Sequence, residues 1–186
     1  MTKTTSINNR RYLGNKYKLL PFIKSVIDSE CQEVNIVVDI FAGTGAVASA
    51  FQDKQLVTND IMYSNYISNF AWFSSRRFSR KKIASIIDKY NSMDIQEDNY
   101  MTENFSDTYC SKIGFIREDI EKKYANKEIN ERERALLITS LLYAMDKIAK
   151  TCGHYDAYRK DVEFDAHIEL LIPEASMTNN KKNKCY

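Results

Sequence analysis

The alternation of apolar and polar residues along the chain predicts helices more often than strands. Its clearest stretch covers residues 130–150, where apolar side chains recur every three or four positions, as on one face of a helix. Asn130 is suited to cap this helix, Glu131 and Glu133 favour its first turn, and Gly153 is expected to end it. We expect this stripe to be core; its members are Ile138, Leu141, Leu142, Met145, Ile148 and Ala149.

Three further segments carry helical patterns. They cover residues 19–27, residues 61–90 throughout, and about 106–124. Residues 91–104 are polar and acidic, and they are predicted to form a loop. Residues 1–9 are polar and are expected to be loose. Only five glycines and two prolines interrupt the chain, which agrees with a largely helical fold.

Two stretches predict strands. Residues 34–40 hold a nearly continuous apolar run, typical of a parallel strand covered on both faces, and residues 55–60 predict a second strand. Gly43 and Gly45 allow a sharp turn after the first strand, and small residues from Ala46 onwards predict a short, closely packed helix. Such a unit exposes backbone N–H groups above the carboxyl end of a sheet, where α/β proteins bind nucleotides.

Length and charge restrict the class of protein only loosely. A chain of 186 residues is most simply one domain, and its 27 basic and 25 acidic residues nearly balance. It shows neither a membrane-spanning apolar run nor a signal sequence, so we expect a cytoplasmic protein. Cys152 and His154 lack further ligands, and no metal site is predicted. The four cysteines are expected to be reduced; they are Cys31, Cys110, Cys152 and Cys185.

A carboxylate before the glycine turn narrows the class of ligand. Gly43, Gly45 and Ala48 fit the dinucleotide pattern G-x-G-x-x-G/A, but Asp39 would face a pyrophosphate and repel it. S-adenosylmethionine instead carries an ammonium and a sulfonium, which this carboxylate would attract. Asp60, 15 residues after Gly45, can accept both hydroxyls of a ribose and can also cap the following helix. S-adenosylmethionine is therefore predicted over NAD, for which the chain also lacks a second βαβ half.

The predicted helix over residues 61–90 changes character along its length. Its first half is rich in aromatic residues, and its second half carries a cluster of arginines and lysines. Aromatic rings beside a basic cluster can bind nucleic acid, whereas an exposed charged helix end is commoner. Both interpretations stay open from the residues alone. The candidate DNA-binding residues of this cluster are Arg76, Arg77 and Arg80.

Three motifs, in order along the chain, carry a family resemblance. They are Tyr12-x-Gly14-x-Lys16, then Asp39-Ile-Phe-Ala-Gly-Thr-Gly45, and then Asn59-Asp60. They resemble the N-terminal motif, the D-x-F-x-G-x-G motif and the acidic second-strand end of the Dam-like adenine-specific DNA methyltransferases. Residues 104–117, 130–150 and 152–158 also resemble the restriction–modification branch of that family.

The resemblance implies a cofactor, a partner and a set of site residues. The cofactor would be S-adenosylmethionine, and the partner double-stranded DNA. In this family the segment after the cofactor motifs recognises the target sequence, which here implies residues 61–173. Carried over residue by residue, the cofactor-binding positions are Tyr12, Lys16, Asp39, Phe41, Gly43, Gly45 and Asp60.

One motif of the family is absent from this chain. The catalytic D/N-P-P-Y needs two adjacent prolines, and the only prolines are Pro21 and Pro173. In the family, the acid or amide of that motif and a backbone carbonyl accept hydrogen bonds from the exocyclic amine of adenine, while the aromatic ring stacks on the flipped base. No residue here can take these roles, so no catalytic residue is predicted.

These inferences combine into an α/β, helix-rich chain with a partial Rossmann-like S-adenosylmethionine-dependent methyltransferase fold and a helical insertion. Residues 1–60 would form the cofactor-binding part, 61–173 the helical target-recognition region, and 174–186 a polar tail. The predicted function is site-specific methylation of adenine in DNA, with this chain as the cofactor-binding and recognition portion. It would be a truncated product, or half of a split enzyme whose second polypeptide carries the catalytic motif. The alternative is an inactive module that binds DNA or a partner.

Overall fold

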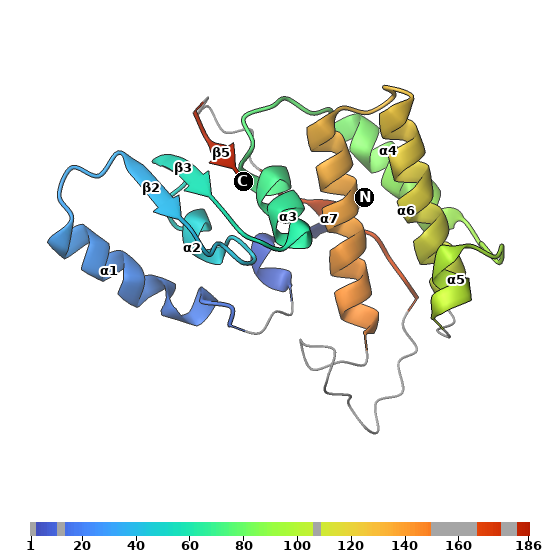
Figure 1. The fold of residues 1–186 in the computed structure, drawn as a ribbon, viewed down its shortest axis with the longest axis horizontal. Helices are drawn as coiled ribbons and strands as arrows, with labels where there is room; N and C mark the ends of the chain where they lie inside the picture. The colour runs from blue at the N-terminus through green and yellow to red at the C-terminus, as the bar shows by residue number, and fades with distance from the viewer. Residues whose placement is uncertain (1–2, 11–13, 106–108, 150–166, 176–181) are drawn as a thin grey trace, which may run out of the picture.

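A small parallel sheet occupies one side of the molecule and a group of helices the other (Figure 1). The computed structural model describes residues 3–10, 14–105, 109–149, 167–175 and 182–186. In chain order its elements are β1 (Thr4–Thr5), η1 (Ile7–Asn9), η2 (Tyr17–Leu19), α1 (Leu20–Glu30), β2 (Ile36–Asp39), α2 (Ala46–Ser49), β3 (Gln55–Thr58), α3 (Tyr63–Phe73), α4 (Arg80–Ser92), α5 (Tyr100–Asn104), α6 (Cys110–Ala125), α7 (Glu131–Ile148), β4 (Ile172–Pro173) and β5 (Lys184–Cys185).

The main sheet has the order β2-β3-β5, and all its strands run parallel. Ile36 of β2 pairs with Gln55 of β3, and Val57 of β3 pairs with Lys184 of β5. A second parallel pair joins β1 to β4. The sequence predicted β2 and β3 but not β5, β1 or β4, because two-residue strands have no readable periodicity. The expectation of a loose N-terminus was wrong for Thr5, which is buried in the β1–β4 pair.

Strand β2 is not covered on both faces, so that prediction was wrong for this chain. Ile36 and Val38 are 53% and 58% exposed, whereas Val37 on the opposite face packs partly against the core. β2 forms the edge of the sheet, and its outer side pairs with no strand of the described residues. Below it in Figure 1, α1 has no fully buried residue, and its Phe22 is 68% exposed. Both β2 and α1 therefore expose apolar side chains.

The predicted continuous helix over residues 61–90 is in fact two helices, α3 and α4. The cause is Arg132 of α7, whose buried guanidinium donates hydrogen bonds to the carbonyl oxygens of Ala71, Trp72 and Arg76. The last carbonyls of α3 are satisfied by this side chain rather than by further helix, and the chain restarts at α4 with Ser79 as its cap.

Helix α7 begins where the sequence predicted. Asn130 caps it by accepting from the backbone N–H groups of Arg132 and Glu133, and Glu133 accepts in return from the backbone N–H of Asn130. The same device starts α5 in the segment predicted as a loop: Asn99 and Thr102 form a second capping box. Helices α3, α4, α6 and α7 enclose a core whose fully buried members include Ile83, Ile87, Ile116, Ile120, Leu136 and Leu137.

Candidate functional site

The glycine turn lies at the carboxyl ends of β2 and β3, which the parallel register brings together. The backbone N–H of Asn59 bonds to the carbonyl of Asp39 at 2.8 Å, and that of Ala42 bonds to the carbonyl of Asn59 at 3.0 Å. Gly43 and Gly45 have φ angles of 51° and 81°, in the left-handed region that favours glycine. The turn is therefore shaped by its own sequence and tied to the end of the neighbouring strand.

Asp39 places an incompletely satisfied carboxylate beneath this turn. It accepts a hydrogen bond from the backbone of Phe41, while its buried Oδ2 has no hydrogen-bond partner among the described residues. Burial raises the pKa of Asp39 above its ordinary value; the Phe41 bond opposes this shift, and the charge of Asp60 adds to it. A cation bound here would relieve both the desolvation and the repulsion.

Asp60 is drawn onto the same turn. Its Oδ2 accepts from the backbone N–H of Gly43 at 2.8 Å, and its Oδ1 accepts from the backbone N–H of Met62 at 2.9 Å and from Asn65 Nδ2 at 3.1 Å. The N-cap residue of α3 is Met62 and not Asp60, so the predicted capping role was wrong. Asp60 bonds to the N–H of that cap residue and also holds the glycine turn. A carboxylate offers about four lone-pair directions, so these three bonds leave room for a further donor.

Two asparagines of α3 also reach the turn, and the sequence reasoning missed them. Asn65 and Asn69 are buried; Asn69 Nδ2 donates to the carbonyl oxygen of Gly43 at 3.0 Å. The available signal was two amides four residues apart on the apolar side of a helix, where a polar side chain needs a partner. Phe41, two residues before Gly43, is by contrast 86% exposed.

The other candidate cofactor residues are less informative. Lys16 is exposed, and its Nζ donates to the carbonyl oxygen of Gly14 at 2.6 Å. Tyr12 lies outside the described residues, as do Cys152 and His154. Among the residues that are described, no group of three or more His, Cys, Asp or Glu side chains could hold a metal ion. In the same part of the chain, no helix is long and apolar enough to cross a membrane.

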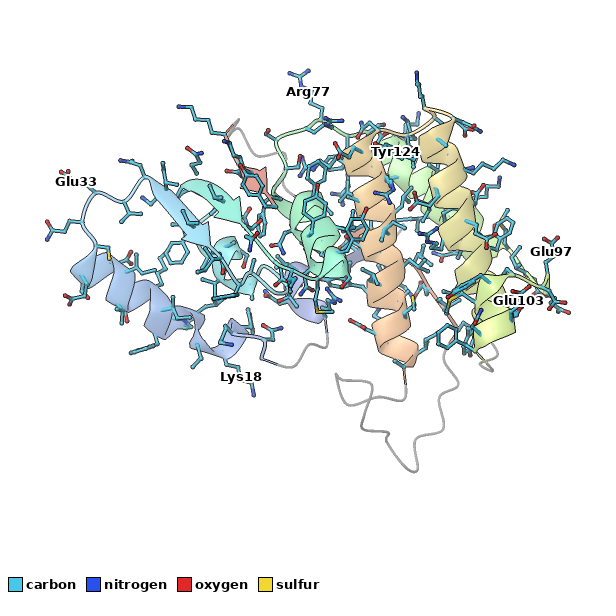
Figure 2. All side chains as sticks on the ribbon, viewed as in Figure 1. Lys18, Glu33, Arg77, Glu97, Glu103 and Tyr124 are labelled. Carbon is cyan, nitrogen blue, oxygen red and sulfur yellow. The ribbon has the colours of Figure 1, made fainter. Side chains whose placement is uncertain are left out.

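The structure does not bring the basic cluster to the glycine turn. Arg76, Arg77 and Arg80 follow the C-terminal end of α3, whereas Asp60 precedes its start, and the 11 residues of α3 span about 16 Å. Arg76 Nη1 lies 3.3 Å from Glu131 Oε2 in an ion pair. Figure 2 shows Arg77 pointing away from the helices at the top of the molecule.

A cavity lies at the opposite end of α3 from this cluster. It encloses about 520 Å³ between α3, α5, α6 and α7, and its walls are mostly apolar. One wall is charged: Arg134 makes a two-pronged ion pair with Glu121 and donates from both Nη atoms to the hydroxyl of Tyr63. This pairing raises the pKa of Arg134, so the guanidinium stays charged. Four members of the apolar stripe predicted as core line this cavity, namely Ile138, Leu141, Leu142 and Met145. Of the six predicted members only Leu141 is buried, so that prediction was wrong for most of the stripe, because the facing helices leave a space there.

Comparison with known proteins decides the family. Residues 12–186 match the model of the D12 class N6 adenine-specific DNA methyltransferases. This chain belongs to that family. Its glycine turn and the two acidic strand ends fall within the matched region.

Curated relatives from restriction–modification systems agree with this assignment. The chain is 30% identical to modification methylase LlaI of Lactococcus lactis subsp. lactis over 201 residues, which cover 95% of this chain and 32% of LlaI. It is 29% identical to type II methyltransferase M.FokI of Planomicrobium okeanokoites, over 95% of this chain and 31% of M.FokI. It is 27% identical to M.NlaIII of Neisseria lactamica, over 88% of this chain and 53% of M.NlaIII.

The chain thus spans about a third of LlaI and of M.FokI, and about half of M.NlaIII. No solved structure matches it.

Proposed function

We propose that this chain holds S-adenosylmethionine at the glycine turn, in a Rossmann-like methyltransferase fold, and that it contributes to the target recognition of a site-specific adenine DNA methyltransferase. Residues 1–60 supply the donor site and the helical region within 61–173 contacts DNA. The donor residues are Tyr12, Lys16, Asp39, Phe41, Gly43, Gly45 and Asp60. The family assignment supports this proposal, and the chemistry of Asp39 carries it.

The residues around the glycine turn fit the donor. The buried Oδ2 of Asp39 has no hydrogen-bond partner among the described residues, and S-adenosylmethionine offers an ammonium and a sulfonium. Gly45 itself leaves no space for a side chain: a Cβ there would meet Asn69 Oδ1 at 2.6 Å and a ring carbon of Phe73 at 2.8 Å. When bound, the donor supplies an electrophilic methyl group; the chain's own task is to hold and orient it.

Calorimetry on three related ligands tests the role of Asp39. S-adenosylmethionine and S-adenosylhomocysteine share the methionine ammonium, whereas adenosine lacks it. We expect Asp39→Asn to weaken the first two by roughly tenfold or more and to leave adenosine unchanged. Asp53→Asn, which alters an exposed acid paired with Lys54, is the matched control. Equal binding by Asp39→Asn, or tighter binding of NAD than of S-adenosylmethionine, would refute the donor site.

Asp60 needs a sharper test, because removing it also releases Gly43. The ligands to compare are S-adenosylhomocysteine and an analogue without the ribose hydroxyls. If Asp60 binds the ribose, wild-type protein prefers the natural ligand and Asp60→Ala binds both about equally. A variant that still discriminates would leave Asp60 as a support of the turn alone.

For DNA, we propose that the duplex lies along α3 and meets the arginines beyond its C-terminal end. The loop that presents them is fixed, because the carbonyl oxygens of Arg76 and Arg77 accept from Arg132 and Asn130. The first turn of α4 contains basic residues and no acidic one, but the carboxylate of Glu133 already accepts from the N–H of Ser79 and from Lys82 at this helix end. The arginines at and before the start of α4 are therefore the charges that we propose for phosphate contact. The length of α3, about 16 Å, equals roughly five base pairs, so one duplex can reach both ends.

Neutralising Arg76, Arg77 and Arg80 to Gln tests this surface. We expect weaker binding to mixed-sequence DNA and a salt dependence reduced by roughly 0.9 in log–log slope for each lost phosphate contact. A matched triple change of Lys18, Lys24 and Lys54 removes the same charge near the sheet and should have little effect. Equal losses in the two variants would mean that the cluster is only part of the general surface charge.

The catalytic motif is proposed to come from a polypeptide segment that pairs with the free edge of β2. The exposed Ile36 and Val38 lie on one face of β2, and further strands and helices of a larger sheet would cover such a face and edge. Phe22 of α1 is exposed as well. The relatives LlaI and M.FokI are about three times as long as the stretch they share with this chain. In this proposal the second segment carries D-P-P-Y and completes the enzyme.

A methyl-transfer assay separates this proposal from the inactive-module alternative. With mixed-sequence DNA and labelled S-adenosylmethionine, we expect no turnover by this chain alone. We expect turnover after a polypeptide segment that carries D-P-P-Y is added. Val38→Lys, on the exposed face of β2, should reduce the rescue. Sustained turnover by this chain alone would overturn the need for a second segment, and DNA binding without rescue would favour the module.

A further inference from the structure

Helix α3 carries two buried amide side chains that fix the peptide groups of Gly43, one directly and one through Asp60. Asn65 and Asn69 have relative exposures of 0% and 1%. Asn69 Nδ2 donates to the carbonyl oxygen of Gly43 at 3.0 Å. Asn65 Nδ2 donates to Asp60 Oδ1 at 3.1 Å, and Asp60 Oδ2 accepts from the N–H of Gly43 at 2.8 Å. Because buried amides are costly unless bonded, this arrangement has a specific target.

Asn69 also packs directly against the second glycine of the turn. A Cβ on Gly45 would lie 2.6 Å from Asn69 Oδ1, and this buried oxygen has no hydrogen-bond partner among the described residues. The contact leaves no space between α3 and the turn. A movement of Asn69 would therefore shift the backbone of the glycine turn, which Asn69 contacts at Gly43 and Gly45.

The amides connect in turn to helix α7 through an arginine of the N-terminal segment. Arg10 Nη1 donates to Asn65 Oδ1 at 3.0 Å, and Arg10 Nε lies 3.5 Å from Asp146 Oδ2. The side chain of Arg10 is only 9% exposed, so solvent screens this ion pair weakly. Asp146 belongs to the last turn of α7. Polar contacts thus run without a break from α7 through Arg10, Asn65 and Asp60 to Gly43.

We propose that Asn65 and Asn69 are positioning residues of the donor site, and that the Arg10–Asp146 pair links donor affinity to the position of α7. The proposal rests on the proposed donor function of the glycine turn and adds the residues that set its shape. Asn69 touches the turn directly, Asn65 acts on it through Asp60, and neither is proposed to touch the donor. They preorganise the Gly43 peptide groups, so that the donor does not have to order the turn on binding.

The first test measures S-adenosylhomocysteine binding by calorimetry at a temperature where all variants are folded. Asn69→Leu removes the bond to Gly43, and Asn65→Leu removes the link to Asp60. We expect each to weaken binding about tenfold. Ser68→Ala is the control, because Ser68 is equally buried on α3 but donates to the carbonyl of Ser64 and does not reach the turn. Asn69→Asp keeps the shape and loses the N–H donors, and it replaces Asn69→Leu if that variant does not fold.

A double-mutant cycle tests whether these contacts act as one connected network. Asn65→Leu and Asp60→Ala should be non-additive in binding, because both break the same route to Gly43. Asp146→Asn should weaken binding by roughly twofold to threefold through Arg10. Additive effects of Asn65→Leu and Asp60→Ala would mean that they act independently, and unchanged binding by Asp146→Asn would remove α7 from the network.

Hydrogen exchange separates failure of this proposal from failure of the donor function. In the ligand-free protein, Asn65→Leu and Asn69→Leu should accelerate exchange of the Gly43 and Gly45 amides, while Ser68→Ala should not. If wild-type protein binds no donor but these amides are protected by the asparagines, only the donor function fails. If wild-type protein binds the donor while Asn65→Leu and Asn69→Leu bind it equally and exchange equally, the positioning role is refuted and the donor function stands.

Discussion

The sheet half of this molecule and its helical half are stabilised in different ways. In the helical half, Ile83, Ile87 and Ile120 of α4 and α6 are completely buried among α3, α6 and α7. In the sheet half, Ile36 of β2 and Phe22 of α1 are apolar yet mostly exposed. The helical half therefore supplies most of the buried core, whereas the proposed donor site lies on a sheet whose outer strand exposes apolar side chains. The same substitution should therefore destabilise the helical half much more than the sheet half.

The largest expected effect comes from truncating matched isoleucines. Ile120→Ala should lower the free energy of unfolding by about 4 kcal/mol, because it removes a fully buried side chain and leaves a cavity. Ile36→Ala should change it by less than about 0.5 kcal/mol, since this side chain is mostly in water already. Urea unfolding of both variants measures the difference. A large loss for Ile36→Ala would mean that another segment or molecule covers the apolar face of β2 in solution.

Arg132 gives the next largest effect. Arg132→Met keeps the aliphatic volume but leaves the carbonyl oxygens of Ala71, Trp72 and Arg76 without their buried donor. We expect a loss of about 3 kcal/mol, or roughly 6–12 °C in Tm. Burial lowers the pKa of Arg132 to about 10, so the guanidinium remains charged at neutral pH. Arg117→Met, on the exposed surface of α6, is the control and should leave Tm unchanged. An equal fall in Tm for Arg117→Met would mean that the buried hydrogen bonds of Arg132 do not cause the loss.

The contacts of Arg132 also show how far the fold could be predicted from the sequence. Long periodic segments such as α7 were predicted with their N-cap, because the signals lie within one stretch of chain. The break between α3 and α4 was missed, since it depends on Arg132, 56 residues after Arg76. The strand β5 was missed for the same reason: two residues gain their structure only by pairing with β3. Burial of β2 was misjudged because a pattern cannot say whether its covering elements are present.

The candidate site divides in the same way. Asp39 and the two glycines form one short motif, and the structure brings Asp60 onto that motif, 2.8 Å from the N–H of Gly43. Tertiary contacts bring three further residues to the site, and no sequence motif predicts them: Asn65, Asn69 and Arg10. A motif predicts the groups that face a ligand, whereas the residues that support those groups depend on tertiary packing.

The halves should also differ in the sign of their pH dependence. In the helical half, burial would raise the pKa of Glu133, but bonds from Asn130, Ser79 and Lys82 outweigh burial and lower it. Its contribution to stability is therefore complete above its unfolded pKa of 4.5 and is lost as pH falls through the folded value. Glu133→Gln should cost about 1–2 kcal/mol at neutral pH and little in acid.

Asp39 in the sheet half shows the opposite sign. Its raised pKa means that the folded, ligand-free protein binds the proton more tightly than the unfolded chain does. This group therefore adds stability as pH falls from neutral through its raised folded pKa, and Asp39→Asn should remove that rise. Thermal unfolding of both variants across the acidic range measures the two slopes. Slopes of the same sign would show that Asp39 is not desolvated in solution.

The smallest expected effect concerns the ion pair between Arg76 and Glu131. The side chains of Arg76 and Glu131 are 55% and 36% exposed and their charged atoms lie 3.3 Å apart, so a double-mutant cycle should give no more than about 0.5 kcal/mol. The pair bears more on binding than on stability, because Glu131 partly neutralises an arginine proposed to contact DNA. Glu131→Gln should therefore strengthen DNA binding by roughly twofold at low salt, and the gain should vanish as salt rises. A variant that binds DNA no better would mean that Arg76 serves the helical half and that the duplex passes elsewhere.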